Sequence, residues 1–107
     1  MDIQINTANN LEGGQGTTER LEASVREHLS RFEDRLTRVE LHVGDENGDR
    51  SNGADIRCQI EARPAGLDPV SVTDQSDTID QATAGALDKL TTVLERTFGK
   101  ATDRKGH

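Results

Sequence analysis

The sequence contains few aromatic and few apolar residues. Trp and Tyr are absent, there are two Phe, and hydrophobic residues make up 31% of the 107 positions. This apolar content is enough for one core, and an open sheet with two helices on one side would suit it. Full disorder is the alternative, because 31% of the residues are charged and the formal net charge is -7. The regular spacing of the apolar residues argues against disorder.

Cysteine and long apolar runs are equally scarce. The single cysteine, Cys58, excludes an internal disulfide framework. No stretch approaches the roughly 20 apolar residues of a membrane helix, and no charged segment followed by an apolar run opens the chain. We therefore expect a soluble cytoplasmic protein that does not interact with a membrane. Its acidity argues against nucleic-acid binding through net charge alone, so the placement of the charges becomes decisive.

The spacing of the apolar residues predicts the order strand, helix, three strands, helix. Strands alternate apolar and polar residues, whereas amphipathic helices repeat apolar residues every three or four positions. The expected strands are 2–7, 38–43, 56–63 and 70–73. The expected helices run near 18–35 and from Asp77 or Thr78 to Gly99, where a glycine would end the helix.

Each expected element has one apolar face. The stripe of the first helix is Leu21, Val25, Leu29, Phe32 and Leu36, and that of the second is Ile79, Ala82, Ala86, Leu90, Val93 and Leu94. Because each strand also has one apolar face, both helices should pack on the same side of the sheet. The predicted fold is α+β, with the order β-α-β-β-β-α and a four-stranded sheet carrying two helices on one face. We expect one domain over 1–98, followed by a polar, flexible tail over 99–107.

Acidic and basic residues separate along the chain and around each helix. Residues 39–55 carry five acids and one Arg. On a helical wheel, Arg20, His28, Arg31 and Arg35 lie within about 80° of one another, with most acids of the first helix on the opposite flank. In the second helix, Lys89 and Arg96 share one flank, whereas Asp80, Asp88 and Glu95 share the other. This separation favours an electropositive strip that could contact phosphates on an otherwise acidic body.

The ordinary explanation of these charges is a solvated helix face with pairs such as Glu22–Arg26. If the strip binds nucleic acid, single-stranded readers that stack bases are disfavoured. Phe32 belongs to the apolar stripe and Phe98 lies at a helix end, so neither offers a stacking surface. Recognition of structured RNA by shape and phosphate fits better.

Several short fragments resemble the hibernation promoting factor and ribosome-associated inhibitor A family. They are Ile3-Gln4-Ile5-Asn6-Thr7, Thr18-Glu19-Arg20-Leu21, Leu36-Thr37-Arg38-Val39-Glu40 and Ala86-Leu87-Asp88-Lys89-Leu90. The resemblance covers residues 2 to about 98. The chain departs from the family in its Gly13-Gly14-Gln15-Gly16 loop, in Asp80, where an aromatic residue is usual, and in its less basic helices.

The resemblance implies a ribosome-hibernation factor of the stress response that inhibits translation. The family's domain binds ribosomal RNA in the decoding channel of the small ribosomal subunit and excludes mRNA and tRNA. Carried over by position, the candidate rRNA-binding residues are Arg20, Arg31, Arg35, Arg38, Lys89 and Arg96. Long family members add a C-terminal dimerisation domain, for which no residues remain here, so a monomer is expected.

Enzymatic and metal-binding motifs are incomplete. The glycine-rich loop lacks the Gly-Lys-Ser/Thr ending of a P-loop, and Cys58 lies on an apolar strand face. Three His without ligand spacing make no zinc site, and the acids near 45–49 lack the calcium-loop register. We expect no enzyme activity, cofactor, metal or small-molecule substrate. The alternative function is an acidic protein-interaction module on the same scaffold, with the 45–55 hairpin meeting a basic partner and ribosome binding lost.

Overall fold

The computed structural model describes residues 1–7, 15–45 and 56–106, with only the backbone of Gln15, Asp45 and residues 100–106. The elements occur in the predicted order, with a short 3-10 helix, η1, after the first helix. They are β1 (Asp2–Thr7), α1 (Gln15–His28), η1 (Ser30–Arg35), β2 (Leu36–Asp45), β3 (Ile56–Pro64), β4 (Val70–Ser76) and α2 (Ile79–Gly106). The predicted fold class is confirmed.

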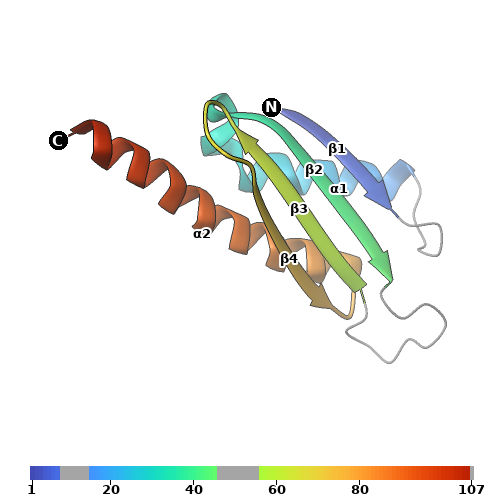
Figure 1. Ribbon diagram of the computed structural model, residues 1–107. Coiled ribbons are helices and arrows are strands. Elements are labelled where there is room, and N and C mark those ends of the chain that lie inside the picture. The colour runs from blue at the N-terminus through green and yellow to red at the C-terminus, as the bar shows by residue number, and fades with distance from the viewer. Residues whose placement is uncertain (8–14, 46–55, 107) are drawn as a thin grey trace.

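The four strands form one sheet in the order β1-β2-β3-β4 (Figure 1). β1 runs parallel to β2, with Ile3 opposite Val39, because α1 carries the chain back across one face of the sheet between them. β3 and β4 each run antiparallel to the preceding strand, as expected for strands joined without a crossover. β1 and β4 are therefore the edge strands.

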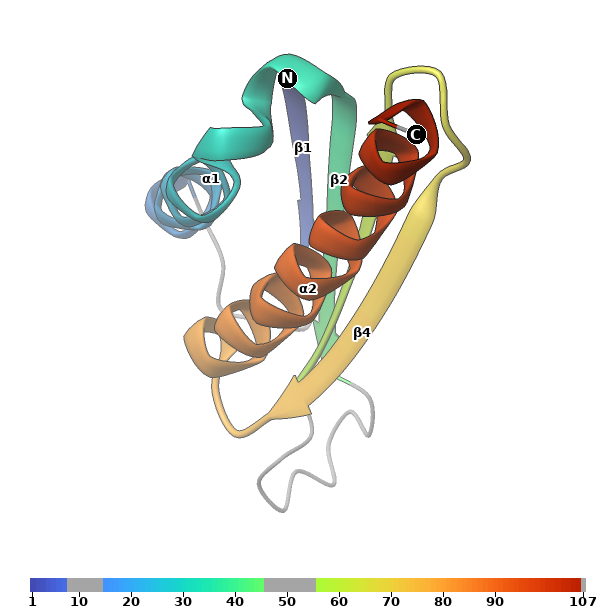
Figure 2. The same cartoon turned by 90° about the vertical axis from the view of Figure 1, so that its left-hand side faces the viewer.

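Both main helices lie on the same side of the sheet (Figure 2). α1 packs on β1, and α2 packs on β3 and β4. The core between helices and sheet contains the whole predicted stripe of the first helix and most of that of the second, with Val25, Leu41, Ile60 and Leu90 completely buried. Val93 was predicted in the second stripe but is only half-buried and outside this core, whereas Leu87 and Phe98, which were not predicted, belong to it. Alternate strand residues therefore face the helices, and the intervening polar ones form an open sheet face on the other side.

The first helix differs from the predicted span of 18–35. It begins at Gln15 and ends at His28, and η1 follows over Ser30–Arg35. Between them Leu29 has φ -106° and ψ 14°, outside helical geometry. Leu29 and Phe32 remain buried because the 3-10 repeat is three residues, which matches their spacing. However, Arg31 and Arg35 belong to η1, so a wheel drawn for one continuous α-helix misplaces them.

The second helix extends beyond its predicted end at Gly99 and continues to Gly106. A C-terminal capping glycine usually adopts a positive φ, which among the described glycines only Gly66 does. Glycine inside a helix costs about 1 kcal/mol relative to Ala, and no proline follows to end the helix. The helical start is as predicted, because Thr78 Oγ1 accepts a hydrogen bond of 3.1 Å from the Gln81 backbone N–H.

Candidate functional site

The six predicted rRNA-binding residues lie in three separate regions of the structure. Arg20 on α1 and Arg31 and Arg35 on η1 lie on the side of these two elements that faces α2; we call α1 and η1 together the first helical segment. Lys89 lies on the side of α2 that faces β4, and Arg96, seven residues later, shares that flank. Arg38 lies on the open sheet face, because its neighbour Val39 points into the core. The structure therefore does not bring the six side chains together into one strip.

The basic flank of the first helical segment faces the acidic flank of α2. Arg20 Nε lies 3.2 Å from Asp80 Oδ1, and Arg31 forms an ion pair with Glu95. All four side chains are more than half exposed, with values of 55% and 63% for the first pair and 57% and 51% for the second. Such exposed pairs contribute only about 0–1 kcal/mol each. They nevertheless place a carboxylate beside each of these two arginines.

Two arginines and two phenylalanines form a cluster between η1 and α2, which we call the arginine corner: Arg31, Arg35, Phe32 and Phe98. The Phe rings are 5.5 Å apart between centroids. The Arg35 guanidinium carbon lies 3.9 Å from the centroid of the Phe98 ring, and that of Arg31 lies 4.9 Å from the Phe32 ring. A guanidinium over a ring is held in place by the ring quadrupole while its N–H groups remain available to an anion.

Arg35 differs from Arg31 in its partners, since Arg31 is paired with Glu95. Arg35 is exposed, and no carboxylate of the described residues forms an ion pair with it. Its partner Phe98 is 5% exposed, so the ring is itself fixed by the core. This stacking could not be predicted from the sequence, because Phe98 was expected at the end of a helix rather than inside one.

Arg38 is held on the other face of the sheet. Its guanidinium lies 2.7 Å from Glu40 Oε2 and also donates a hydrogen bond to Gln4 Oε1. Gln4 and Glu40 are register partners on the neighbouring strands β1 and β2, and Arg38 contacts both of their side chains. A partner that contacts Arg38 must therefore approach the face opposite the helices.

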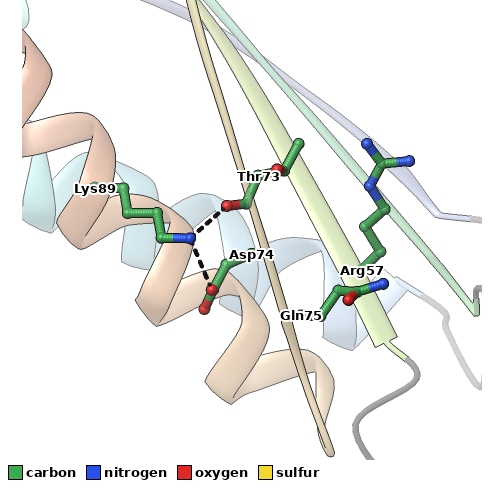
Figure 3. A pocket seen from close by; sticks show the side chains of 5 residues that line it. All are labelled: Arg57, Thr73, Asp74, Gln75 and Lys89. Atoms are coloured by element: carbon green, nitrogen blue, oxygen red, sulfur yellow. Dashed lines mark hydrogen bonds and ion pairs between the residues drawn. The ribbon is translucent and has the colours of Figure 1, made fainter.

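Lys89 joins α2 to the edge strand β4 (Figure 3). Its Nζ lies 3.1 Å from Asp74 Oδ1 and donates a hydrogen bond of 2.9 Å to the Thr73 carbonyl. These residues, with Arg57 and Gln75, line an open pocket of about 530 Å³ at the strand edge. The Asp74 side chain is only 27% exposed, and there is room for it between β4 and α2 because residue 85 of α2 is glycine. A Cβ there would lie 1.8 Å from Asp74 Oδ2.

Sequence reasoning missed Asp74 and Gly85, although a glycine inside a predicted helix was a usable signal of close approach.

Arg96 is exposed and forms no ion pair with another described residue. Together with Lys89, it lies on the β4 flank of α2, whereas Asp80 and Glu95 face the first helical segment. The basic flanks of the two helices therefore do not meet in one groove.

Cys58 is completely buried, as the apolar strand face predicted. The pKa of its thiol is raised to about 11, mainly because burial disfavours the thiolate; the Thr83 side chain lowers the pKa, and the charge of Asp74 raises it. The thiol is therefore protonated at neutral pH, which is the wrong state for a nucleophile. Across 1–7, 15–45 and 56–106, no group of three His, Cys, Asp or Glu could hold a metal ion. The calcium-like loop and most of the 45–55 hairpin lie outside the described residues.

None of the helices described here has the length and apolar character required to cross a membrane. This finding agrees with the polar composition of both helices outside their buried stripes.

Two solved structures share this fold. The first is the N-terminal domain of Protein Y from Thermus thermophilus, with a TM-score of 0.71 and 20% identity, covering 91% of this chain and 99% of that one. The second is a ribosomal subunit interface protein from Coxiella burnetii, with a TM-score of 0.70 and 15% identity, covering 92% of this chain and 99% of that one. At these identities the likeness concerns the fold alone. No curated protein sequence matched the chain.

A family model extends the comparison from fold to sequence. The model described as Sigma 54 modulation protein / S30EA ribosomal protein matches residues 9–102, which is most of the 107-residue chain. This match includes α1, the arginine corner and α2 through Gly99. The chain therefore belongs to the Sigma 54 modulation protein / S30EA ribosomal protein family.

Proposed function

We propose that this protein is a ribosome-associated factor that binds the small ribosomal subunit and inhibits translation. The observation that carries the proposal is the family match over residues 9–102. The name of the Coxiella burnetii structure, a ribosomal subunit interface protein, is consistent with it. The place of action would be the decoding channel in the cytoplasm, as the resemblance of the sequence fragments implies.

The mechanism is steric occlusion. A domain seated in the decoding channel prevents mRNA and tRNA from occupying the same volume, and this requires no bond to be made or broken. The protein would therefore act without a cofactor or small-molecule substrate. Binding energy comes from arginine and lysine contacts with rRNA phosphates, each of which releases condensed counterions.

Among the six candidate residues, we assign the primary rRNA contact to the arginine corner. Arg35 combines exposure, freedom from a paired carboxylate among the described residues, and a guanidinium held over Phe98. Arg31 is adjacent and exposed, although it is paired with Glu95. Arg20, Arg38, Lys89 and Arg96 remain secondary candidates. Arg38 could take part only if rRNA also reaches the open sheet face.

Co-sedimentation of the purified protein with small ribosomal subunits tests this proposal. We expect the wild-type protein to move with the subunits at low salt and to dissociate as salt is raised. Neutralising the corner with Arg31→Gln and Arg35→Gln should weaken binding about tenfold or more and reduce the salt dependence by about one unit per lost phosphate contact.

Arg26→Gln is the matched control. Arg26 lies on α1 but pairs with Glu22 on the same helix rather than facing α2. Arg26→Gln removes one positive charge, as each of Arg31→Gln and Arg35→Gln does singly, and it should retain binding within about twofold because this charge lies away from the arginine corner. A wild-type protein that stays at the top of the gradient at low salt would refute the ribosomal function.

A further inference from the structure

Two ion pairs connect the first helical segment to α2 along the length of their contact. Arg20 pairs with Asp80 near the start of α2, and Arg31 pairs with Glu95 in its second half. The two acids are fifteen residues apart, or about 22 Å along the helix. Both arginines are candidate phosphate contacts, and both pairs are open to solvent.

These pairs do little for the packing of the two helices. Both helices contribute apolar side chains to one common core, among them Leu21, Leu87 and Phe98, all at most 5% exposed. That burial dominates the contact, because exposed ion pairs contribute at most about 1 kcal/mol. By contrast, the Lys89–Asp74 pair is built into the structure, since Asp74 is mostly buried against Gly85 and Lys89 also binds a backbone carbonyl.

A phosphate that binds Arg20 or Arg31 meets a carboxylate already in place. It must either displace this carboxylate or share the guanidinium with it, and in both cases the two negative groups repel each other. The site therefore binds a polyanion less tightly than its arginine content suggests.

We propose that Asp80 and Glu95 are affinity-setting residues: they occupy Arg20 and Arg31 as internal competitors of the rRNA phosphates. This inference rests on the proposed function and adds to it how tightly the site binds. The ion pairs are weak enough for rRNA phosphates to replace the carboxylates of Asp80 and Glu95 where the RNA fits this surface of the protein. They also penalise polyanions that cannot offer several phosphates at once, which favours structured RNA over incidental contacts.

The test measures binding of small ribosomal subunits to Asp80→Asn, Glu95→Gln and the double variant. Each substitution removes one negative charge and keeps the side-chain size. We expect about three- to fivefold tighter binding for each single variant and about tenfold for the double variant, from the size of an exposed ion pair. The decrease of affinity with salt should also become steeper, because each freed arginine then binds a phosphate without a neutralising neighbour.

Glu22→Gln supplies the matched control. It releases Arg26 from an exposed pair of the same kind, but Arg26 does not face α2. If tighter binding came only from the less negative net charge, Glu22→Gln would act as strongly as Glu95→Gln. Equal effects of the two would overturn the inference, and so would weaker binding by the Asp80 and Glu95 variants. Thermal unfolding of every variant checks that the fold is kept.

The outcomes separate this inference from the function on which it rests. If the wild type binds, and Arg31→Gln with Arg35→Gln weakens binding, but the acid variants match the control, then the function stands and the inference fails. If neither wild type nor any variant binds, both fail together.

Discussion

Replacing Gly85 with alanine tests the closest contact between helix and sheet. A Cβ at position 85 would lie 1.8 Å from Asp74 Oδ2 and 2.8 Å from its Cγ, distances that real atoms do not adopt. Asp74 must therefore turn away and give up its pair with Lys89, or the strand must shift. Overpacking of this kind costs about 1–3 kcal/mol, against the gain of about 1 kcal/mol that alanine brings to a helix interior.

Gly99→Ala is the control that isolates the clash. Gly99 lies in the same helix, and a Cβ there would have no neighbour within 4 Å. Because the gain in helix propensity is common to both substitutions, the difference in unfolding free energy between them reports the contact with Asp74. We expect Gly99→Ala to stabilise by up to about 1 kcal/mol and Gly85→Ala to be less stable than it by about 1–3 kcal/mol.

Urea unfolding followed by circular dichroism measures these differences. A double variant, Gly85→Ala with Asp74→Ala, removes the obstacle and should recover much of the stability lost by Gly85→Ala alone. If Gly85→Ala stabilises the protein as much as Gly99→Ala does, then Asp74 does not lie against this helix as described, and the account of the Lys89 region fails.

Two further predictions concern the core. The pKa of Cys58 is raised from 9.0 to about 11, so its thiol ionises at lower pH in the unfolded chain than in the folded one. The free energy of unfolding should therefore fall by about 2 kcal/mol as pH rises from 9 to 11. Urea unfolding across this pH range should show the fall in the wild type and no such fall in Cys58→Ala. No difference between wild type and Cys58→Ala would contradict the assigned burial of the thiol. Leu90 is completely buried, and Leu90→Ala should cost about 2–5 kcal/mol, visible as a lower urea midpoint with an unchanged slope.

The order of elements and the core could be predicted from the sequence because both follow from apolar spacing. Val25, Leu41, Ile60 and Leu90 recur at the intervals of their helices and strands, and all are completely buried. The break at Leu29 could not be predicted in this way. A 3-10 turn keeps the next apolar residue, Phe32, on the buried side at its spacing of three, so the sequence pattern is the same with or without the break.

The candidate site was predicted less completely, for a geometric reason. A helical wheel assigns Arg20 and Arg31 to one flank of the first segment and Asp80 and Glu95 to one flank of the second. It does not say which flank of one helix faces the other, because that depends on how both helices pack on the sheet. The structure shows that the basic flank of the first segment faces the acidic flank of α2, so that Arg20 pairs with Asp80 and Arg31 with Glu95.

The same arrangement explains why net charge is a poor guide to what this protein binds. At physiological ionic strength the Debye length is about 8 Å, so a phosphate at Arg31 is screened from most of the charges behind the formal -7. Glu95, in direct contact with Arg31, is not screened in this way. Neutralising a distant acid should therefore change binding little, whereas neutralising Glu95 should change it several-fold. The carboxylates in direct contact with the arginines, rather than the net charge of the chain, therefore determine how strongly the arginines bind a polyanion.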